Sequence, residues 1–252
     1  MNNIVAINGS PKTKNSASAM FINQIENFLE TEITVYQAIT LARQEDISIA
    51  LTDILKADML LIVFPLYVDS ISAPLIKVLT LLEREVINTN AQFPKVYAIC
   101  NCGFYEDTHT RLALSIIENF SVRSGLPWGY GVGIGGGEFV RMQTNLCTTV
   151  ILRVAKRSRS IHTPHGSCDF AQDDKQWTQR YAEVPKGLAA NVDAALRELA
   201  ESIQSGSVGK QNVFVSPKVP RFLYRLGGNM RWLYMAWKHG KAHSIKTRPH
   251  RP

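Results

Sequence analysis

The sequence predicts an α/β protein with a doubly wound, parallel sheet of five strands in the order 2-1-3-4-5, followed by a basic C-terminal helical extension. Three observations predict this fold. Short apolar runs alternate with stretches of helical periodicity over the first 140 residues. The run Met59-Leu60-Leu61-Ile62-Val63-Phe64 is apolar at every position, as in a strand buried on both faces. A polar loop follows the first apolar run, where nucleotide-binding α/β domains place a phosphate site.

The apolar runs predict strands at 3–8, 33–37, 58–64, 95–101 and 126–134. Stripes of apolar residues at helical spacing lie between them. These stripes are Met20/Phe21/Ile25/Phe28/Leu29, Ile47/Leu51/Leu55, Leu75/Val78/Leu79/Leu82/Val86 and Leu112/Ile116/Phe120. The fifth helix has two candidates, one from Leu146 through Leu152 and a clearer one over Leu188/Val192/Leu196/Leu199/Ile203. The first domain is therefore expected to span 1–206.

A polar segment at about 153–185 interrupts this domain and has no periodicity, so we expect disorder or a surface excursion there. His162, His165 and Cys168 superficially resemble metal ligands, but no fourth ligand is placed and no metal site is expected. The remaining cysteines, Cys100, Cys102 and Cys147, have no metal-site spacing, and we expect reduced structural thiols.

Composition points to a cytoplasmic protein. The first twenty residues contain no basic and apolar signal pattern, and no apolar run reaches the roughly 18–20 residues that a spanning helix needs. The net charge of +7 is unevenly distributed. Residues 207–252 contain ten Lys or Arg and no Asp or Glu, which leaves 1–206 at −3 (7 − 10). The basic residues therefore belong to the C-terminal extension.

The loop Asn8-Gly9-Ser10-Pro11-Lys12-Thr13-Lys14-Asn15-Ser16 joins the first strand to the first helix. A helix N-terminus with unpaired N–H groups and nearby hydroxyls is suited to bind an anion. The loop lacks the second Gly-Lys-Ser of a Walker loop and the three glycines of a dinucleotide fingerprint. Its hydroxyls and amides suit a single terminal monophosphate, such as that of FMN. The alternative is an ordinary N-cap with solvated polar residues.

The exit of the third strand reads Phe64-Pro65-Leu66-Tyr67-Val68-Asp69-Ser70-Ile71-Ser72-Ala73-Pro74-Leu75-Ile76-Lys77. In the expected fold this loop lies beside the first loop, at the switch point of the sheet. Pro65 and Tyr67 could form a wall for a flat ligand. Alternatively, the segment is a buried strand that ends in a proline turn, with Ser70 or Ser72 capping the next helix.

Together, Asn8-Gly9-Ser10-Pro11 with Ser16 and the later P-L-Y-x-x-S-x-x-x-P-L-x-K pattern resemble the flavodoxin-like NAD(P)H-dependent FMN reductases and quinone reductases. Gly9-Ser10-Pro11 matches the phosphate loop of that family. Residues of the second flavin loop and its helix match at Pro65, Tyr67, Ser70, Pro74, Leu75 and Lys77. The resemblance covers roughly 2–140 and resumes weakly at 186–206.

The third loop, Asn101-Cys102-Gly103-Phe104-Tyr105-Glu106, departs from the Thr-Gly-Gly-type sequence of many relatives, and only Gly103 matches cleanly. Phe104 or Tyr105 could stack on the flavin ring. The resemblance then implies a cofactor site formed by three loops. Its expected residues are Ser10, Lys12, Asn15, Ser16, Ser18, Pro65, Leu66, Tyr67, Val68, Ser70, Asn101, Gly103, Phe104 and Tyr105.

The implied function is an FMN-dependent oxidoreductase that takes electrons from NAD(P)H and passes them to a quinone, free flavin or another small acceptor. The cofactor supplies the redox chemistry, so no catalytic acid or base is assigned. Two alternatives are a flavodoxin-like electron carrier that does not oxidise nicotinamide and a flavin-bound interaction protein.

Two further segments leave alternatives open. Gly135-Gly136-Gly137 could let the backbone approach a ligand or a partner subunit, or form a flexible turn. In the basic extension, Phe222, Leu226, Met230, Leu233 and Trp237 form a helical stripe, weakened by two glycines. We favour an amphipathic helix at 220–240 that docks on its own domain or on a second subunit of a homodimer, as the resemblance implies. Peripheral contact with an anionic membrane is the second interpretation. Nucleic acid is not expected, because no recognised module is present.

Overall fold

The computed structural model describes residues 3–13, 15–88, 93–141, 187, 189–208 and 211–238. The chain forms two units, 1–217 and 218–252. The predicted segments at 146–152 and 153–185, together with His162, His165 and Cys168, lie outside the described residues.

The first unit is a parallel sheet of six strands in the order β2-β1-β3-β4-β5-β6. Its strands are β1 (Ile4–Asn8), β2 (Thr34–Gln37), β3 (Met59–Pro65), β4 (Lys95–Asn101), β5 (Trp128–Ile134) and β6 (Val213–Val215). The predicted doubly wound order 2-1-3-4-5 is confirmed. The sixth strand was not predicted, and it comes from the segment that composition assigned to the basic extension.

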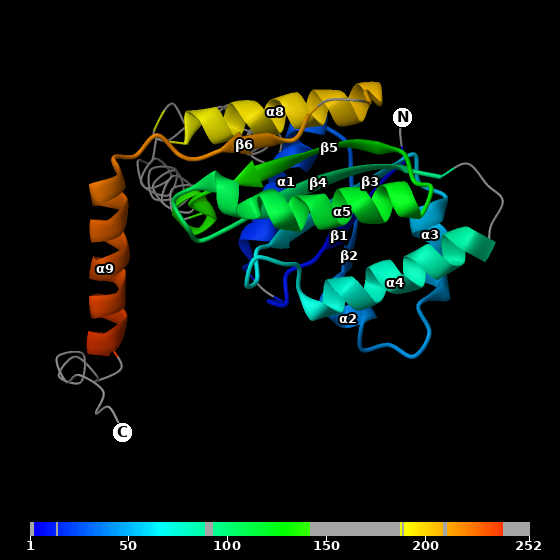
Figure 1. The fold of residues 1–252 in the computed structure, drawn as a ribbon, viewed down its shortest axis with the longest axis horizontal. Helices are drawn as coiled ribbons and strands as arrows, with labels where there is room; N and C mark the ends of the chain where they lie inside the picture. The colour runs from blue at the N-terminus through cyan, green and yellow to red at the C-terminus, as the bar shows by residue number, and fades with distance from the viewer. Residues whose placement is uncertain are drawn as a thin grey trace, which may run out of the picture. The chain divides into compact units, whose positions relative to one another are not determined.

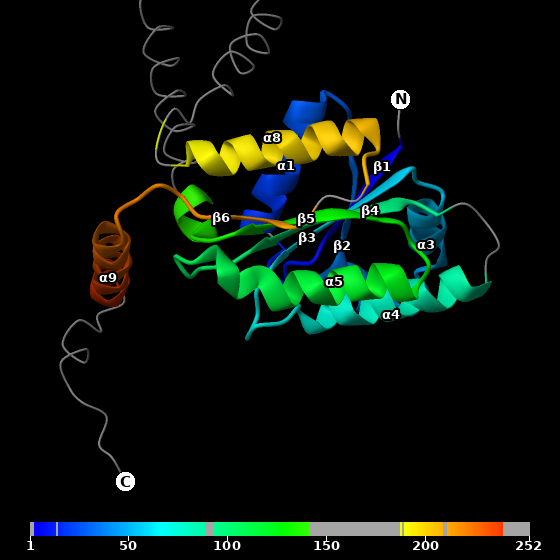
Figure 2. The ribbon, with the colours of Figure 1, turned by 45° about the horizontal axis from the view of Figure 1, so that its top comes forward.

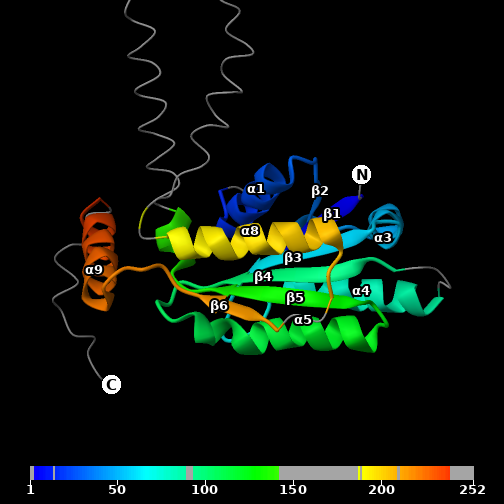
Figure 3. The same ribbon diagram turned by 90° about the horizontal axis from the view of Figure 1, so that it is seen from above.

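Helices cover both faces of this sheet, as Figures 1 and 3 show for the first unit. On one face lie α1 (Ala17–Leu29) and α8 (Ala190–Ser205). The other face carries α2 (Ala38–Leu41), α3 (Ser48–Leu55), α4 (Ala73–Asn88) and α5 (Arg111–Arg123), the last preceded by the 3₁₀ turn η1 (Asp107–Thr110). β3 contributes side chains to the hydrophobic cores on both faces of the sheet. Met59 to Phe64 are buried, as the unbroken apolar run predicted.

One predicted helix face is wrong in part. Leu112 and Ile116 of α5 are exposed, and Phe120 is partly buried. The buried face is instead formed by Ala113, Leu114, Ile117 and Ser121. The Leu114 side chain packs against Gly131 of β5, where a β-carbon would lie only 2.8 Å from Leu114 Cδ2. A glycine in the strand leaves room for the Leu114 side chain, so the helix packs on β5 through this face.

Tyr97 joins β4 to the turn that ends α8. Its hydroxyl lies 2.9 Å from the Ser202 carbonyl oxygen and 2.7 Å from that of Ser207, and the ring is fully buried. Burial is the main cause that raises the pKa of Tyr97 to about 12, opposed by the Ser207 contact and reinforced by Tyr130. The strand and the α8 turn therefore share a buried polar anchor.

Tyr97→Phe should lower the free energy of unfolding by about 0.5–1.5 kcal/mol, because the buried hydroxyl's one hydrogen bond, shared between the Ser202 and Ser207 carbonyls, is lost. The wild-type protein should also lose stability as pH rises from 10 to about 12. In that window the unfolded tyrosine releases its proton while the folded one keeps it, so the unfolded state is favoured. Denaturant melts across this range check both effects. An equally steep alkaline loss in Tyr97→Phe would contradict the assignment.

The second unit contains α9 (Arg221–Lys238), the helix predicted at 220–240. Two prolines precede it, Pro217 and Pro220, and the carbonyl of Pro220 accepts hydrogen bonds from the N–H groups of Leu223 and Tyr224. Figure 2 shows α9 as a single continuous helix. Over the described residues, no helix combines the length and apolar character needed to cross a membrane.

Candidate functional site

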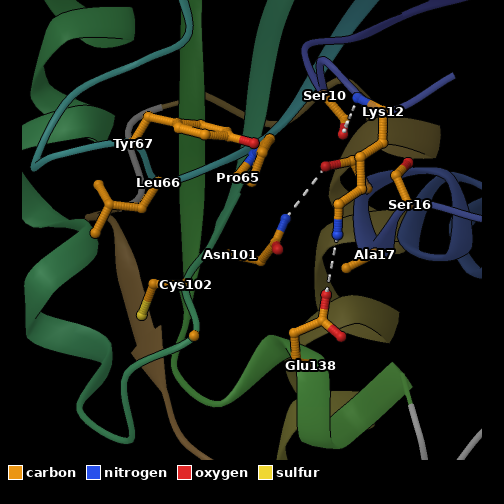
Figure 4. A pocket seen from close by; sticks show the side chains of 12 residues that line it. Ser10, Lys12, Ser16, Ala17, Pro65, Leu66, Tyr67, Asn101, Cys102 and Glu138 are labelled. Atoms are coloured by element: carbon orange, nitrogen blue, oxygen red, sulfur yellow. Dashed lines mark hydrogen bonds and ion pairs between the residues drawn. The ribbon is translucent and has the colours of Figure 1, made fainter. Parts of the chain in front are cut away.

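A pocket of about 160 Å³ opens at the carboxyl edge of the sheet. It is lined by Ser10, Lys12, Ser16, Ala17, Ser18, Pro65, Leu66, Tyr67, Asn101, Cys102, Gly103 and Glu138 (Figure 4). These residues follow β1, β3, β4 and β5. The carboxyl ends of parallel strands lie at one edge of the sheet. From β1 the chain continues to β2 on one side, and from β3 it continues to β4 on the other side, so the loops after β1 and β3 diverge and leave a crevice between them.

The first wall is the loop after β1. Ser16 caps α1, since its Oγ accepts a hydrogen bond from the Ala19 N–H at 3.0 Å. Ser10 Oγ accepts one from the Lys12 N–H at 3.2 Å. The first-turn N–H groups of Ala17 and Ser18 have no acceptor within the helix. Buried hydroxyls and these N–H groups thus line one end of the pocket, beside the positive end of the helix dipole.

Buried contacts hold this loop on the sheet. The Gly9 N–H donates to the Val63 carbonyl at 2.8 Å, and Ser72 Oγ donates to the Gly9 carbonyl at 2.8 Å. A β-carbon at Gly9 would lie 2.7 Å from Cβ of Phe64 and from Cδ2 of Leu75. The glycine is therefore required by packing between β3 and α4 rather than by contact with a ligand.

Asn101 connects three of the elements around the pocket. Its side-chain amide donates to the Phe64 carbonyl at 3.1 Å and to Ser18 Oγ at 3.3 Å, and its own carbonyl accepts from the Leu66 N–H at 2.8 Å. The side chain is buried. It therefore orients the Ser18 hydroxyl and sets the starting point of the loop after β3.

The loop after β3 is a tight turn. Tyr67 and Ser70 form an antiparallel bridge with two backbone hydrogen bonds of 2.9 Å, and the central residues Val68 and Asp69 have φ of 46° and 57°. Positive φ at both central residues is typical of a type I′ turn, which favours Asn and Gly. A valine there is strained by about 1–2 kcal/mol. The turn places Tyr67 on the pocket and Val68 in solvent, 97% exposed.

Val68→Asn is expected to raise the free energy of unfolding by about 0.5–1 kcal/mol, because Asn adopts positive φ more readily. Chemical denaturation measures the change. Ile49→Asn, which also replaces an exposed β-branched residue but at a helical position, is the control and should not stabilise the protein. A loss of stability in Val68→Asn would show that valine is favoured at the turn for a reason other than its backbone.

The pocket has a further wall, formed by the segment after β5, whose residues were not among those predicted for the site. Glu138 ends the glycine run, and its carboxylate lies 3.8 Å from Lys12 Nζ and 2.8 Å from Arg141 Nη2. Arg141 also donates to the Asn15 carbonyl at 3.4 Å. The Glu138 carboxylate thus holds two cations beside the end of the pocket that is lined by serine hydroxyls. The acid at the end of a glycine-rich turn is the signal that could have identified it.

The glycine run itself packs against the loop after β4. Gly136 N–H donates to the Phe104 carbonyl at 2.6 Å, and Gly137 N–H donates to the Cys102 carbonyl at 2.8 Å. The run thus packs closely on a neighbouring loop, a contact that the sequence did not predict.

Cys102 was also absent from the predicted site, although it lines the pocket. Its thiol lies 3.6 Å from the carbonyls of Phe104 and Glu106. Burial raises the pKa of Cys102, with backbone hydrogen bonds acting in the opposite direction. Burial also raises the pKa of Cys100. Both are free thiols, and their raised pKa values favour the protonated form at neutral pH.

Nine of the fourteen predicted site residues line the pocket. The other five do not: Asn15, Val68, Ser70, Phe104 and Tyr105. Asn15 is exposed with φ of 52°, and Ser70 closes the turn on Tyr67. Phe104 stacks on the His109 ring, with centroids 4.7 Å apart. In the described part of the chain, no cluster of three metal-ligating side chains occurs.

Sheet order and pocket position together decide the fold class. The fold is flavodoxin-like. No family model matches the chain, and no curated protein does.

Solved structures give similarities at low identity. The chain is similar to an NADH:FMN oxidoreductase (EmoB, apo form), with 17% identity, 73% of this chain and 92% of the other covered, and a TM-score of 0.45. It is also similar to an NADPH-quinone reductase from P. pentosaceus, with 13% identity, 74% and 100% covered, and a TM-score of 0.43. A general stress protein 14 from Treponema denticola in complex with FMN shares 13% identity over 56% and 90%, with a TM-score of 0.43.

Proposed function

We propose that this protein binds FMN non-covalently in the pocket at the carboxyl edge and uses it to oxidise NAD(P)H. One observation carries the proposal. A buried hydroxyl cradle at a helix N-terminus opens, within the same pocket, onto a wall formed by Pro65, Leu66 and Tyr67. The first part suits a phosphate monoester and the second a flat aromatic ring, in the order in which FMN presents them.

The pocket residues fit FMN by their donor chemistry. Ser10, Ser16 and Ser18 present hydroxyls, and α1 presents first-turn N–H groups, all of which can donate to phosphate oxygens. Lys12, 62% exposed and paired with Glu138, adds a cation at the mouth. The flavin supplies hydride acceptance from NAD(P)H and electron donation to a quinone, free flavin or another small acceptor.

The protein's own residues bind the cofactor and orient the groups around it. Asn101 holds Ser18 and the start of the 65–70 loop in one arrangement, and the strained turn at 68–69 fixes Tyr67 at the edge of the pocket. We assign no acid–base role to Cys102, because burial raises the pKa of its thiol.

Binding and turnover are tested separately. Titration of the apoprotein with FMN, followed by flavin fluorescence, should show saturable quenching at a stoichiometry of about one. Steady-state oxidation of NADH and of NADPH, with FMN or menadione as acceptor, then tests the reaction. A protein that binds FMN but oxidises neither nucleotide is an electron carrier or a flavin-bound interaction protein. Absence of FMN binding overturns the proposal as a whole.

Glu138→Gln should tighten FMN binding severalfold. The substitution removes a negative charge near the phosphate dianion and leaves the Lys12 charge uncompensated. The effect should shrink as salt increases, since the groups are partly exposed. Equilibrium titration at two ionic strengths measures it.

Glu83→Gln is the matched control, because Glu83 pairs with Arg123 at 3.2 Å on α4 and α5, and it should leave FMN affinity unchanged. Weaker binding by Glu138→Gln would instead show that the carboxylate accepts hydrogen bonds from the ligand.

A further inference from the structure

The helix α9 presents a narrow apolar stripe to solvent. Phe222, Leu226, Met230 and Leu233 are 68%, 55%, 61% and 52% exposed, and Trp237 continues the line. At about 100° per residue, these five positions fall within an arc of roughly 80°. Large apolar side chains gathered on one side of a helix are unusual on a protein surface unless they meet a partner.

The polar side of this helix is basic. Arg221, Arg225 and Lys238 are exposed and lie outside the arc of the stripe. The whole segment 207–252 contains ten Lys or Arg and no Asp or Glu, so the segment supplies no acid to neutralise these charges. A stripe of Phe, Leu and Trp on a helix whose charged residues are all basic and lie outside the stripe is typical of helices that lie in a membrane interface.

The centre of the helix is intrinsically weak. Gly227 and Gly228 lie outside the arc of the stripe, and each costs roughly 1 kcal/mol of helix stability relative to Ala. An 18-residue helix with two central glycines is marginal when isolated in water. The helix gains stability when a surface covers its apolar stripe. This gain accounts for the five large apolar residues on one side of a segment that forms a helix only weakly by itself.

We propose that α9 docks on an anionic lipid surface, with the Phe222–Trp237 stripe in the headgroup boundary and the basic side chains on lipid phosphates. Charge decides between this occupant and a second copy of the helix. Two copies of a segment with ten cations and no acids repel each other, whereas each cation near an anionic leaflet strengthens binding about fivefold. The docking of this helix on protein, favoured from the sequence, becomes an outcome of the test.

The test uses the full chain and vesicles of zwitterionic phosphatidylcholine, alone or with about one third phosphatidylglycerol. We expect flotation with the anionic vesicles only, and loss of binding at high salt. Leu226→Asp places a charge on the stripe and should weaken vesicle binding at least tenfold. Leu112→Asp is the matched control, since Leu112 is an exposed leucine on α5, and it should bind vesicles like the wild type.

Three readouts of Leu226→Asp separate the outcomes. Vesicle binding unchanged by Leu226→Asp would show that cations alone are responsible and would overturn the stripe's role. Conversion of a dimer into monomers by the substitution, measured by light scattering, would assign the stripe to a second copy and overturn the proposal. A fall in melting temperature would assign it to the protein's own surface, with the same consequence. FMN affinity should not change, so failure here is independent of the proposed flavin site.

Discussion

Ser10→Ala should weaken FMN binding ten- to a hundredfold. Ser10 is 2% exposed, lines the pocket, and carries a hydroxyl whose proton is available while its oxygen accepts the Lys12 N–H. A hydrogen bond from this hydroxyl to a phosphate is charge-assisted, and its loss costs about 1.5–3 kcal/mol of binding free energy. Fluorescence titration of both apoproteins measures the ratio of dissociation constants.

Thr13→Ala is the control for this measurement. Thr13 belongs to the same loop and carries the same kind of group, but it is exposed and does not line the pocket. Its removal should leave the dissociation constant within about twofold, since surface substitutions of this kind are nearly neutral. Equal effects from the two substitutions would indicate a general change in the loop, and no effect from Ser10→Ala would place the phosphate elsewhere.

Gly135→Ala should destabilise the first unit by up to about 3 kcal/mol. A β-carbon there would collide with the backbone carbonyl oxygen of Tyr105 and lie 2.8 Å from the backbone nitrogen of Asp107. Backbone atoms cannot rotate away as a side-chain tip does, so the loop after β4 or strand β5 must shift. Urea unfolding followed by tryptophan fluorescence measures the loss.

Gly103→Ala provides the matched comparison. Gly103 lies in the loop after β4, on which Gly135 packs, and has an ordinary φ, and a β-carbon there meets no atom within 4 Å. We expect its stability to change by less than about 0.5 kcal/mol. If Gly135→Ala were as stable as Gly103→Ala, the close packing of the glycine run on the 102–107 loop would be disproved.

The parts of the fold that the sequence predicted are those with a strong local signal. The unbroken apolar run at 59–64 identified the central strand, and the stripe from Val192 to Ile203 identified α8. β6 was missed because three residues, Val213-Phe214-Val215, are too short to show a period and stand in a basic segment. The α5 face was missed because Leu112, Ile116 and Phe120 also lie at helical spacing, whereas the buried face includes the small residues Ala113 and Ser121, which carry little hydrophobic signal.

The site was predictable in the loops after β1 and β3, which carry recognisable motifs, and less predictable in the loops after β4 and β5. Ser10, Ser16 and Tyr67 line the pocket as expected. Phe104 was expected near the flavin ring because it is aromatic; it does not line the pocket, and its ring packs at a tilt against His109, a contact that no local pattern indicated. Glu138 was missed because its role depends on distance to Lys12, 126 positions earlier in the chain, and no local pattern encodes such a pairing.

The short strand β6 also protects the rest of the sheet. It pairs with β5 from Val132 to Ile134, and just before it Asn212 accepts the Gly131 N–H at 2.7 Å through its side-chain oxygen. Without this cover, β5 would present a row of unpaired N–H and C=O groups along a glycine-rich, apolar strand, which is a template for intermolecular strand addition. A proteolytic cut between α8 and β6 would therefore promote aggregation, whereas a cut after Pro217 would leave the edge closed.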